Sequence, residues 1–208
     1  DDEISRKPNF VFVEPSCGHG DIVVALVEVL KKAQIPADSI SIQGYDIDPG
    51  AITRCQQRQE FLADHCDYSH CMHWKCQNFL QTKQEYFYRK SKSNDAGVSS
   101  TSRLQFVCCL GGPPYTSGAG SSTNMQRDLP TQFLSHCQNV WRADLVVFLL
   151  PARYREPRSI LGESGNEWDC DTQELESSTF YFQGMEKVTQ PSIIQTITRR
   201  ERDSADTS

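Results

Sequence analysis

The stretch Val13-Glu14-Pro15-Ser16-Cys17-Gly18-His19-Gly20-Asp21 decides the fold of this chain. It joins the apolar run 10–13 (FVFV), which is typical of a buried strand, to residues 21–32 (DIVVALVEVLKK), whose apolar side chains recur at helical spacing. Glycine tolerates positive φ angles and lets a ligand approach the backbone closely. Gly18 and Gly20 therefore predict a tight strand-to-helix turn that cradles a bound cofactor.

The same alternation of strand and helix continues along the chain. Further strands are predicted at 40–45, 74–79, 104–110 and 145–150, and helices at 49–61 and 129–140. Strands alternating with helices predict an α/β fold, Rossmann-like, with a mostly parallel sheet and helices on both faces. Residues 179–182 and 193–198 predict a closing pair of antiparallel strands, and 162–176 is interpreted as an acidic loop.

Length and composition favour one soluble globular domain. The 208 residues are 38% hydrophobic and 23% charged, and we expect a single domain over 1–200 with a frayed tail at 201–208. The apolar run 145–150 is too short to cross a bilayer, so no membrane partner is expected. The nine cysteines are scattered, which favours a reducing, intracellular compartment, cytoplasmic or nuclear.

The net charge limits how the chain can bind nucleic acid. A formal charge of −6 is the wrong sign for a protein that grips phosphates with its whole surface. Any nucleic-acid contact must therefore be a local patch or be supplied by a protein partner. Arg153 and Arg155, directly after the predicted strand at 145–150, are the candidate phosphate contacts.

Unusual residues follow each predicted strand. Glu14 follows the first, Asp46 the second, and Asn78 lies at the end of the third. The segment 112–115 (GPPY) follows the fourth, and Pro151 follows the fifth. Ligands of parallel α/β sheets lie beyond the carboxyl ends of the strands, so we expect one edge of the sheet to carry the site.

Two carboxylates narrow the choice of cofactor. Asp46 is placed to accept hydrogen bonds from two ribose hydroxyls. Glu14, ahead of the glycines, would gain nothing beside a pyrophosphate, but it suits a cofactor that carries sulfonium and ammonium cations. Together they favour S-adenosylmethionine over a dinucleotide.

The segment 112–115 is suited to presenting a planar amine. Pro113 and Pro114 fix φ near about −65° and supply no N–H donor, which leaves their carbonyls to accept from a substrate amine. Tyr115 offers a flat ring on which a base can stack. Methyl transfer from a sulfonium is an in-line displacement, in which positioning dominates.

The order of these motifs resembles the class I S-adenosylmethionine-dependent amino-methyltransferases of the adenine-N6 and glutamine-N5 type. The resemblance covers about residues 10–160. It implies methylation of the exocyclic amine of adenine in nucleic acid, with S-adenosylmethionine as cofactor. The implied cofactor-binding residues are Glu14, Pro15, Ser16, Gly18, Gly20, Asp46, Ile47, Asn78 and Phe79, the catalytic residues Gly112, Pro113, Pro114 and Tyr115, and the substrate-binding residues Tyr115, Arg153 and Arg155.

Gly112 departs from the family, which has Asn, Asp or sometimes Ser before Pro-Pro-aromatic. Loss of one positioned hydrogen-bonding group costs about a hundred- to a thousandfold in rate. A protein glutamine methyltransferase and a catalytically weak or inactive binding module of the same fold therefore remain as alternatives. A dehydrogenase is disfavoured, because it explains neither Glu14 nor the Pro-Pro-Tyr segment.

Two cysteine-containing features are interpreted as structural. Residues 65–76 hold three histidines and three cysteines, but no two cysteines have the close spacing of a zinc motif, so the sequence predicts no metal site. Cys17 has no activating base near it in sequence and is interpreted as a small packed residue.

Overall fold

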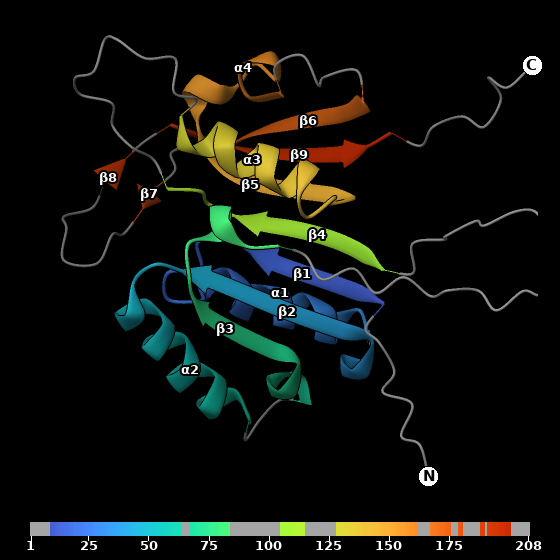
Figure 1. Cartoon of the computed structure of the whole chain (residues 1–208), viewed down its shortest axis with the longest axis vertical. Helices are drawn as coiled ribbons and strands as arrows, with labels where there is room; N and C mark the ends of the chain where they lie inside the picture. Colours follow the sequence, from blue (N-terminus) through green and yellow to red (C-terminus); the bar gives the residue numbers. More distant parts are fainter. Residues whose placement is uncertain are drawn as a thin grey trace, which may run out of the picture. The chain divides into compact units, whose positions relative to one another are not determined.

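The computed structural model describes residues 9–63, 67–83, 105–114, 128–161, 167–175, 179–180, 188–189 and 191–200 (Figure 1). Seven strands form one mixed sheet with the hydrogen-bonded order β3-β2-β1-β4-β5-β9-β6, and β7 and β8 form a separate pair. The predicted α/β, Rossmann-like fold is thereby confirmed. No helix in the described part of the chain is long and apolar enough to cross a membrane.

The chain forms two compact units, residues 1–108 and 109–208, and the division falls inside β4 (Phe106–Gly111). The N-terminal unit contains β1 (Phe10–Glu14), α1 (Asp21–Lys32), β2 (Ile40–Asp46), α2 (Pro49–Ala63) and β3 (Met72–Cys76). Short 3-10 turns lie at η1 (Ala37–Ser39), η2 (Asp67–Cys71) and η3 (Phe79–Gln81). The predicted bounds of α1 are those observed.

Helices α1 and α2 pack on the same face of these strands. β1, β2 and β3 are parallel, and the register brings Glu14, Gly44 and Trp74 side by side on this face. Apolar side chains of α1 pack on β2, while Cys55 of α2 packs with Cys17 and against the ring of Trp74. The last residues of β1 and β2 therefore lie beneath the start of both helices.

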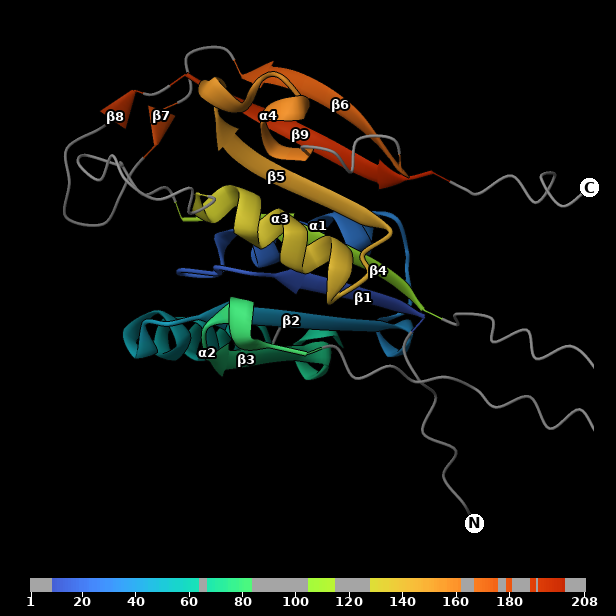
Figure 2. The ribbon, with the colours of Figure 1, turned by 45° about the horizontal axis from the view of Figure 1, so that its top comes forward.

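The C-terminal unit is built around an antiparallel trio of strands. It contains α3 (Leu129–Asn139), β5 (Leu145–Pro151), η4 (Ala152–Tyr154), α4 (Arg158–Leu161), β6 (Trp168–Leu175) and β9 (Ser192–Arg199). β9 runs antiparallel to both β5 and β6 and lies between them (Figure 2). Ile193 and Ile197 of β9 are fully buried, and Ile194 is half-buried, as suits a strand in the interior of the sheet.

The sequence predicts a loop over 162–176, but strand β6 occupies most of the second half of this stretch, so this prediction is wrong. The segment 168–175 is polar because β6 is the last strand of the sheet, with water available to many of its side chains. Trp168 is buried, and the residues from Asp169 to Gln173 alternate between exposed and half-buried, a period of two that the acidic composition obscured.

Two further strand predictions were wrong in detail. β7 (Thr179–Phe180) pairs with β8 (Val188–Thr189) and not with β9, so the closing antiparallel partner of β9 within the sheet is β6. The third strand was expected at 74–79, but it runs from Met72 to Cys76 and leaves Phe79 in η3. The tail 201–208 lies outside the described residues.

Candidate functional site

The turn after β1 has the backbone that its glycines predict. Gly18 and Gly20 have φ angles of 49° and 77°, in the left-handed region, and Gly20 is the N-cap of α1. A Cβ on Gly20 would lie 3.2 Å from Sγ of Cys55 and 3.2 Å from the ring of Trp74. Nothing lies within 4 Å of the corresponding position at Gly18, so its backbone is open to a ligand.

Asp46, the last residue of β2, holds this turn in place. Its Oδ2 accepts a hydrogen bond of 2.9 Å from the N–H of Gly18, and its Oδ1 accepts one of 2.9 Å from the N–H of Asp48. An ionised carboxylate has about four acceptor sites, so about two remain for a ligand's hydroxyls. The structure thus brings together two motifs that are 28 residues apart in the sequence.

Glu14, the last residue of β1, is a buried carboxyl with one oxygen that lacks a hydrogen-bond partner among the described residues. The residue is 2% exposed, and the oxygen without a partner in the described part of the chain is Oε2. Burial raises the pKa of Glu14 well above its usual value, and the negative charges of Cys55, Asp21 and Asp46 raise it further. A ligand cation near this carboxyl would offset both effects, so the site fits a sulfonium cofactor.

The other predicted cofactor residues differ in their exposure. Ile47, directly after Asp46, is 75% exposed, which is unusual for a large apolar side chain and suits a planar base. Pro15 is buried and Ser16 is half-buried.

At the end of β3, the predicted cofactor residues already serve the fold. Oδ1 of Asn78 accepts a 3.0 Å hydrogen bond from the N–H of Leu80 and caps η3. Phe79 is 1% exposed, and its ring centroid lies 5.8 Å from that of Tyr45. Asn78 stands exposed, whereas Phe79 is part of the core, and a cofactor role for either stays a prediction.

The segment that follows β4 is described through Pro114. Gly111 has a φ of 151°, which side chains rarely permit. Gly112 is half-buried, Pro113 is buried and Pro114 is exposed. Tyr115 lies outside the described residues, as do His65 and Cys66 of the cysteine- and histidine-rich stretch.

The turn after β5 holds Arg153 in a network that the sequence did not reveal. The hydroxyl of Tyr154 donates to Asp128, and Nη2 of Arg153 donates to that hydroxyl over 3.3 Å. The guanidinium lies 4.9 Å from the centroid of the Tyr154 ring. Nε2 of Gln195 donates to the Tyr154 carbonyl over 2.7 Å, so strand β9 fixes this turn.

Charge in this network is distributed unequally. Burial raises the pKa of Tyr154, and its hydrogen bond to Asp128 adds to the shift. Burial opposes ionisation of Asp128, but hydrogen bonds from Thr131 and Tyr154 outweigh it and lower the pKa.

Arg155, the other predicted phosphate contact, forms an ion pair with Glu174, with 2.9 Å between Nε and Oε1. An Asp directly before Leu-Pro is a typical helix N-cap, so the sequence could have predicted the capping role of Asp128. No local sequence pattern indicates its contact with Tyr154.

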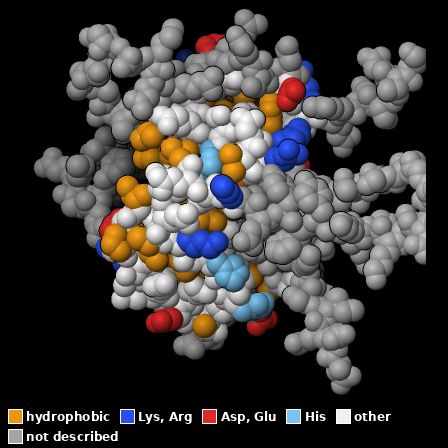
Figure 3. Space-filling view, viewed as in Figure 1, with side chains coloured by type: hydrophobic (Ala, Val, Ile, Leu, Met, Phe, Trp, Pro, Cys, Tyr) orange, Lys and Arg blue, Asp and Glu red, His pale blue; other side chains and the backbone are white. Residues whose placement is uncertain are grey.

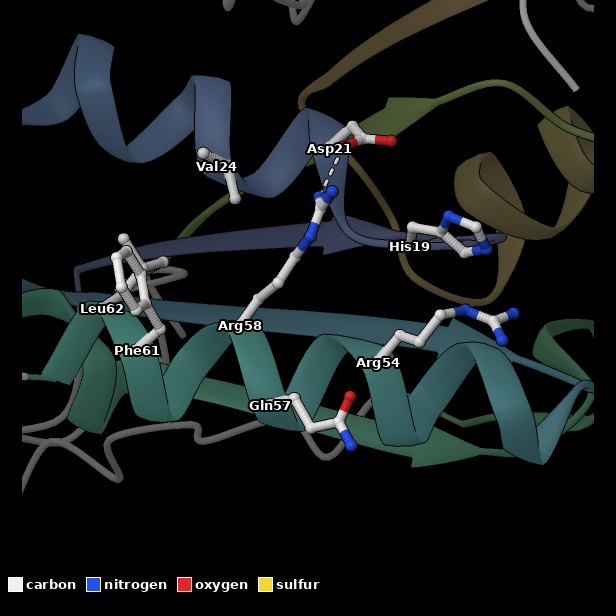
Figure 4. A pocket seen from close by; sticks show the side chains of 8 residues that line it. All are labelled: His19, Asp21, Val24, Arg54, Gln57, Arg58, Phe61 and Leu62. Atoms are coloured by element: carbon white, nitrogen blue, oxygen red, sulfur yellow. Dashed lines mark hydrogen bonds and ion pairs between the residues drawn. The ribbon is translucent and has the colours of Figure 1, made fainter. Parts of the chain in front are cut away.

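A groove of about 510 Å³ lies between α1 and α2 (Figure 4). His19 and Asp21 line it from the glycine turn after β1 (residues 15–20) and the start of α1, and Arg54 and Arg58 line it from α2. Figure 4 shows Arg58 reaching across to Asp21, with which it forms an ion pair. The groove is a tertiary feature without a sequence motif, and we did not predict it.

Comparison with known proteins shows the fold. No family model matches the chain, and no curated protein matches its sequence. Among solved structures, an rRNA methylase from Streptococcus thermophilus is similar at a TM-score of 0.53 with 8% identity, covering 94% of this chain and 90% of that one.

Two further solved structures of other methyltransferases are similar to this chain. Magnesium protoporphyrin IX methyltransferase from Synechocystis PCC 6803, with bound SAM, has a TM-score of 0.52 at 16% identity, covering 93% of this chain and 71% of that one. The M protein of the type I restriction enzyme EcoKI has a TM-score of 0.55 at 13% identity, covering 93% and 40%. The chain therefore has the fold of class I S-adenosylmethionine-dependent methyltransferases.

Proposed function

We propose that this protein is an S-adenosylmethionine-dependent amino-methyltransferase that methylates the exocyclic amine of adenine in nucleic acid. The observation that carries the proposal is the arrangement of Gly18, Asp46 and Glu14. A turn open to a ligand is hydrogen-bonded to a carboxylate with spare acceptor sites, and the nearby buried carboxyl of Glu14 has an oxygen without a partner in the described part of the chain.

S-adenosylmethionine supplies an electrophilic methyl group on a sulfonium. Asp46 accepts hydrogen bonds from the ribose hydroxyls while it keeps its bonds to Gly18 and Asp48. Glu14, once ionised, stabilises the cation by its field in a buried environment. The exposed side chain of Ile47 covers one face of the adenine.

The segment 112–115 holds the substrate amine. Neither proline has an N–H, so the carbonyls of Gly112 and Pro113 accept from the amine without a competing donor nearby in the segment. Tyr115 stacks on the base. Gly112 contributes no side-chain acceptor, and we therefore expect turnover slower than an Asn or Asp at this position would give, by about a hundred- to a thousandfold.

Nucleic acid is the proposed substrate because the resemblance and two of the structural neighbours point to it. An rRNA methylase and a restriction-enzyme M protein share the fold at low identity. The basic side chains visible in Figure 3 form small separate groups among the described residues on that face, so specificity requires a local patch or a protein partner. Arg153 is the proposed contact to phosphate.

A protein glutamine substrate is the second candidate. The net charge of −6 and the ion pair between Arg155 and Glu174 favour it, because both weaken attraction for a polyanion. A carboxamide is also a flat amine and suits the same Pro-Pro segment.

Transfer of labelled methyl groups from S-adenosylmethionine to separated RNA, DNA and protein pools tests the proposal. We expect label in adenine of a nucleic-acid pool, and strongly reduced label after Asp46→Ala when the cofactor is not saturating. Label in glutamine side chains of the protein pool would instead identify a protein glutamine methyltransferase. Cofactor binding without transfer to any pool, and no rescue by Gly112→Asn, identifies a binding module and contradicts the proposal.

A further inference from the structure

Two cysteines meet at the base of the glycine turn. Sγ of Cys17, in the turn, lies 4.0 Å from Sγ of Cys55 in α2, although the residues are 38 apart in sequence. Their side chains are 4% and 0% exposed, and both are free thiols. Two thiols in contact can react with each other, which a single buried cysteine cannot do.

Glycines make room for this contact. Sγ of Cys55 lies 3.2 Å from where a Cβ on Gly20 would be, and it lies 3.3 Å from the carbonyl oxygen of Gly18. On the other side, Cβ of Cys17 lies 3.3 Å from where a Cβ on Gly44 would be. The sulfur of Cys55 therefore lies against Gly20, and Cβ of Cys17 lies against Gly44, where larger residues would crowd the pair.

The surroundings of the two thiols are electrostatically unequal. A hydrogen bond with Cys17 lowers the pKa of Cys55 against the effect of burial, and the guanidiniums of Arg58 and Arg54 lower it further. The same hydrogen bond, together with burial, raises the pKa of Cys17. When the pair loses one proton, the negative charge therefore resides on Cys55, near the two arginines that line the groove in Figure 4.

We propose that Cys17 and Cys55 form an oxidation site, at which hydrogen peroxide closes a disulfide beneath the glycine turn. The Cys55 thiolate attacks one oxygen of the peroxide and breaks the O–O bond, which gives a sulfenic acid on Cys55 and hydroxide. The hydroxide takes up the proton that Cys55 has lost and becomes water.

Cys17 completes the reaction. Its sulfur attacks Sγ of Cys55, forms the S–S bond and displaces hydroxide, which takes the proton of Cys17 and becomes a second water. Two thiols are oxidised and one peroxide is reduced. Because both sulfurs are buried, we expect peroxide to reach them only during local opening, so that the reaction is slow.

The disulfide would distort the turn that the cofactor uses. The sulfurs must approach from 4.0 Å to about 2.05 Å. Cys17 is also fixed through its backbone, because its N–H donates to the carbonyl of Tyr45 over 2.8 Å and its carbonyl accepts from the N–H of Gly20 over 2.7 Å. Its displacement would pull on Gly18 and weaken the bond to Asp46. Loss of cofactor affinity on oxidation rests on the proposed function, whereas the disulfide does not.

Peptide mapping tests for the disulfide directly. The full chain is reduced, treated with hydrogen peroxide and digested with trypsin without reductant. We expect the peptide 55–58 (CQQR) to be linked to the peptide that contains Cys17 and ends at Lys31. Cys55→Ser and Cys17→Ser should each abolish this product, and Cys170→Ser, a cysteine outside the pair, should leave it unchanged. Absence of the linked peptide from the oxidised wild type overturns the proposal.

Hydrogen exchange and cofactor binding test the consequence separately. We expect faster exchange at the Gly18 amide in the oxidised protein, and S-adenosylmethionine affinity weaker by about tenfold or more, both reversed by dithiothreitol. A linked peptide with unchanged exchange and unchanged affinity contradicts the proposed coupling. If the reduced protein binds no S-adenosylmethionine, the proposed function fails, and the exchange result still decides whether oxidation alters the turn.

Discussion

The N–H of Gly18 donates a 2.9 Å hydrogen bond to Oδ2 of Asp46, and this bond joins the turn after β1 to the end of β2. Neighbouring parallel strands bring their carboxyl ends to the same edge of the sheet, and here the register aligns Glu14 with Gly44, two residues before Asp46. The same carboxylate thus shapes the glycine turn and offers acceptor sites to a ligand beside it.

Replacing Asp46 should therefore affect both the turn and cofactor affinity. We expect Asp46→Ala to weaken S-adenosylmethionine binding about ten- to a hundredfold, since hydrogen bonds to a charged group contribute about 1.5–3 kcal/mol each. Calorimetric titration measures the affinity, and circular dichroism checks that the fold persists. Ser41→Ala, at a half-buried position in the same strand, is the control. Unchanged affinity in a folded Asp46→Ala protein would rule out this role.

Glu14→Gln should change how stability depends on pH. The pKa of Glu14 is raised by burial in the folded protein, so its acid form adds stability at low pH that is lost as the pH rises through the folded pKa. Gln keeps the shape and cannot ionise. In urea unfolding without cofactor, the free energy of unfolding of the variant should rise relative to that of the wild type as the pH rises, by about 1–3 kcal/mol at most.

For cofactor binding, the same substitution should be a disadvantage at high pH, whereas it is an advantage for stability. Ionised Glu14 attracts a sulfonium, so wild-type affinity should increase as the pH rises through the pKa of this carboxyl, while Glu14→Gln affinity stays flat. Titration calorimetry across the same pH series measures both. Parallel pH profiles for the two proteins would show that the cation does not interact with Glu14.

Much of this arrangement follows from local sequence, and the remainder depends on tertiary contacts. The helix at 21–32 and the ends of β1 and β2 were predictable because apolar periodicity and turn residues act over short distances. Strand β6 was missed because its polar side chains reflect its place at the sheet edge. The pairs Cys17–Cys55 and Asp128–Tyr154 join residues 38 and 26 apart, and no local pattern encodes them.

Gly44 should tolerate no side chain. An added Cβ would lie 2.4 Å and 2.5 Å from two ring atoms of Trp74, which is a rigid neighbour from β3. We expect Gly44→Ala to destabilise the fold by about 1–3 kcal/mol or more through overpacking. Gly50→Ala is the matched control, because its Cβ would meet only the carboxylate of Asp48 and the tip of Arg54. Equal midpoints for both variants in urea unfolding would contradict the packing argument.

Arg153 and Arg155 should contribute unequally to a nucleic-acid substrate. Arg155 is engaged by Glu174, whereas Arg153 is held over the Tyr154 ring by a hydroxyl that donates to Asp128. We expect Arg153→Ala to raise KM for RNA and to reduce the dependence of log affinity on log salt by about 0.7–0.9, the value for one lost phosphate contact.

Arg155→Ala is the matched comparison, because the exposed ion pair that it breaks contributes little to stability. It should leave the salt dependence nearly unchanged. Tyr154→Phe removes the hydroxyl that accepts from Arg153, so it should raise KM for RNA while kcat changes less. If Arg153→Ala and Arg155→Ala reduce the salt dependence equally, both arginines contact phosphate and the ion pair opens on binding. If neither changes it, the turn after β5 does not meet nucleic acid, and a protein substrate becomes the better explanation of the Pro-Pro segment.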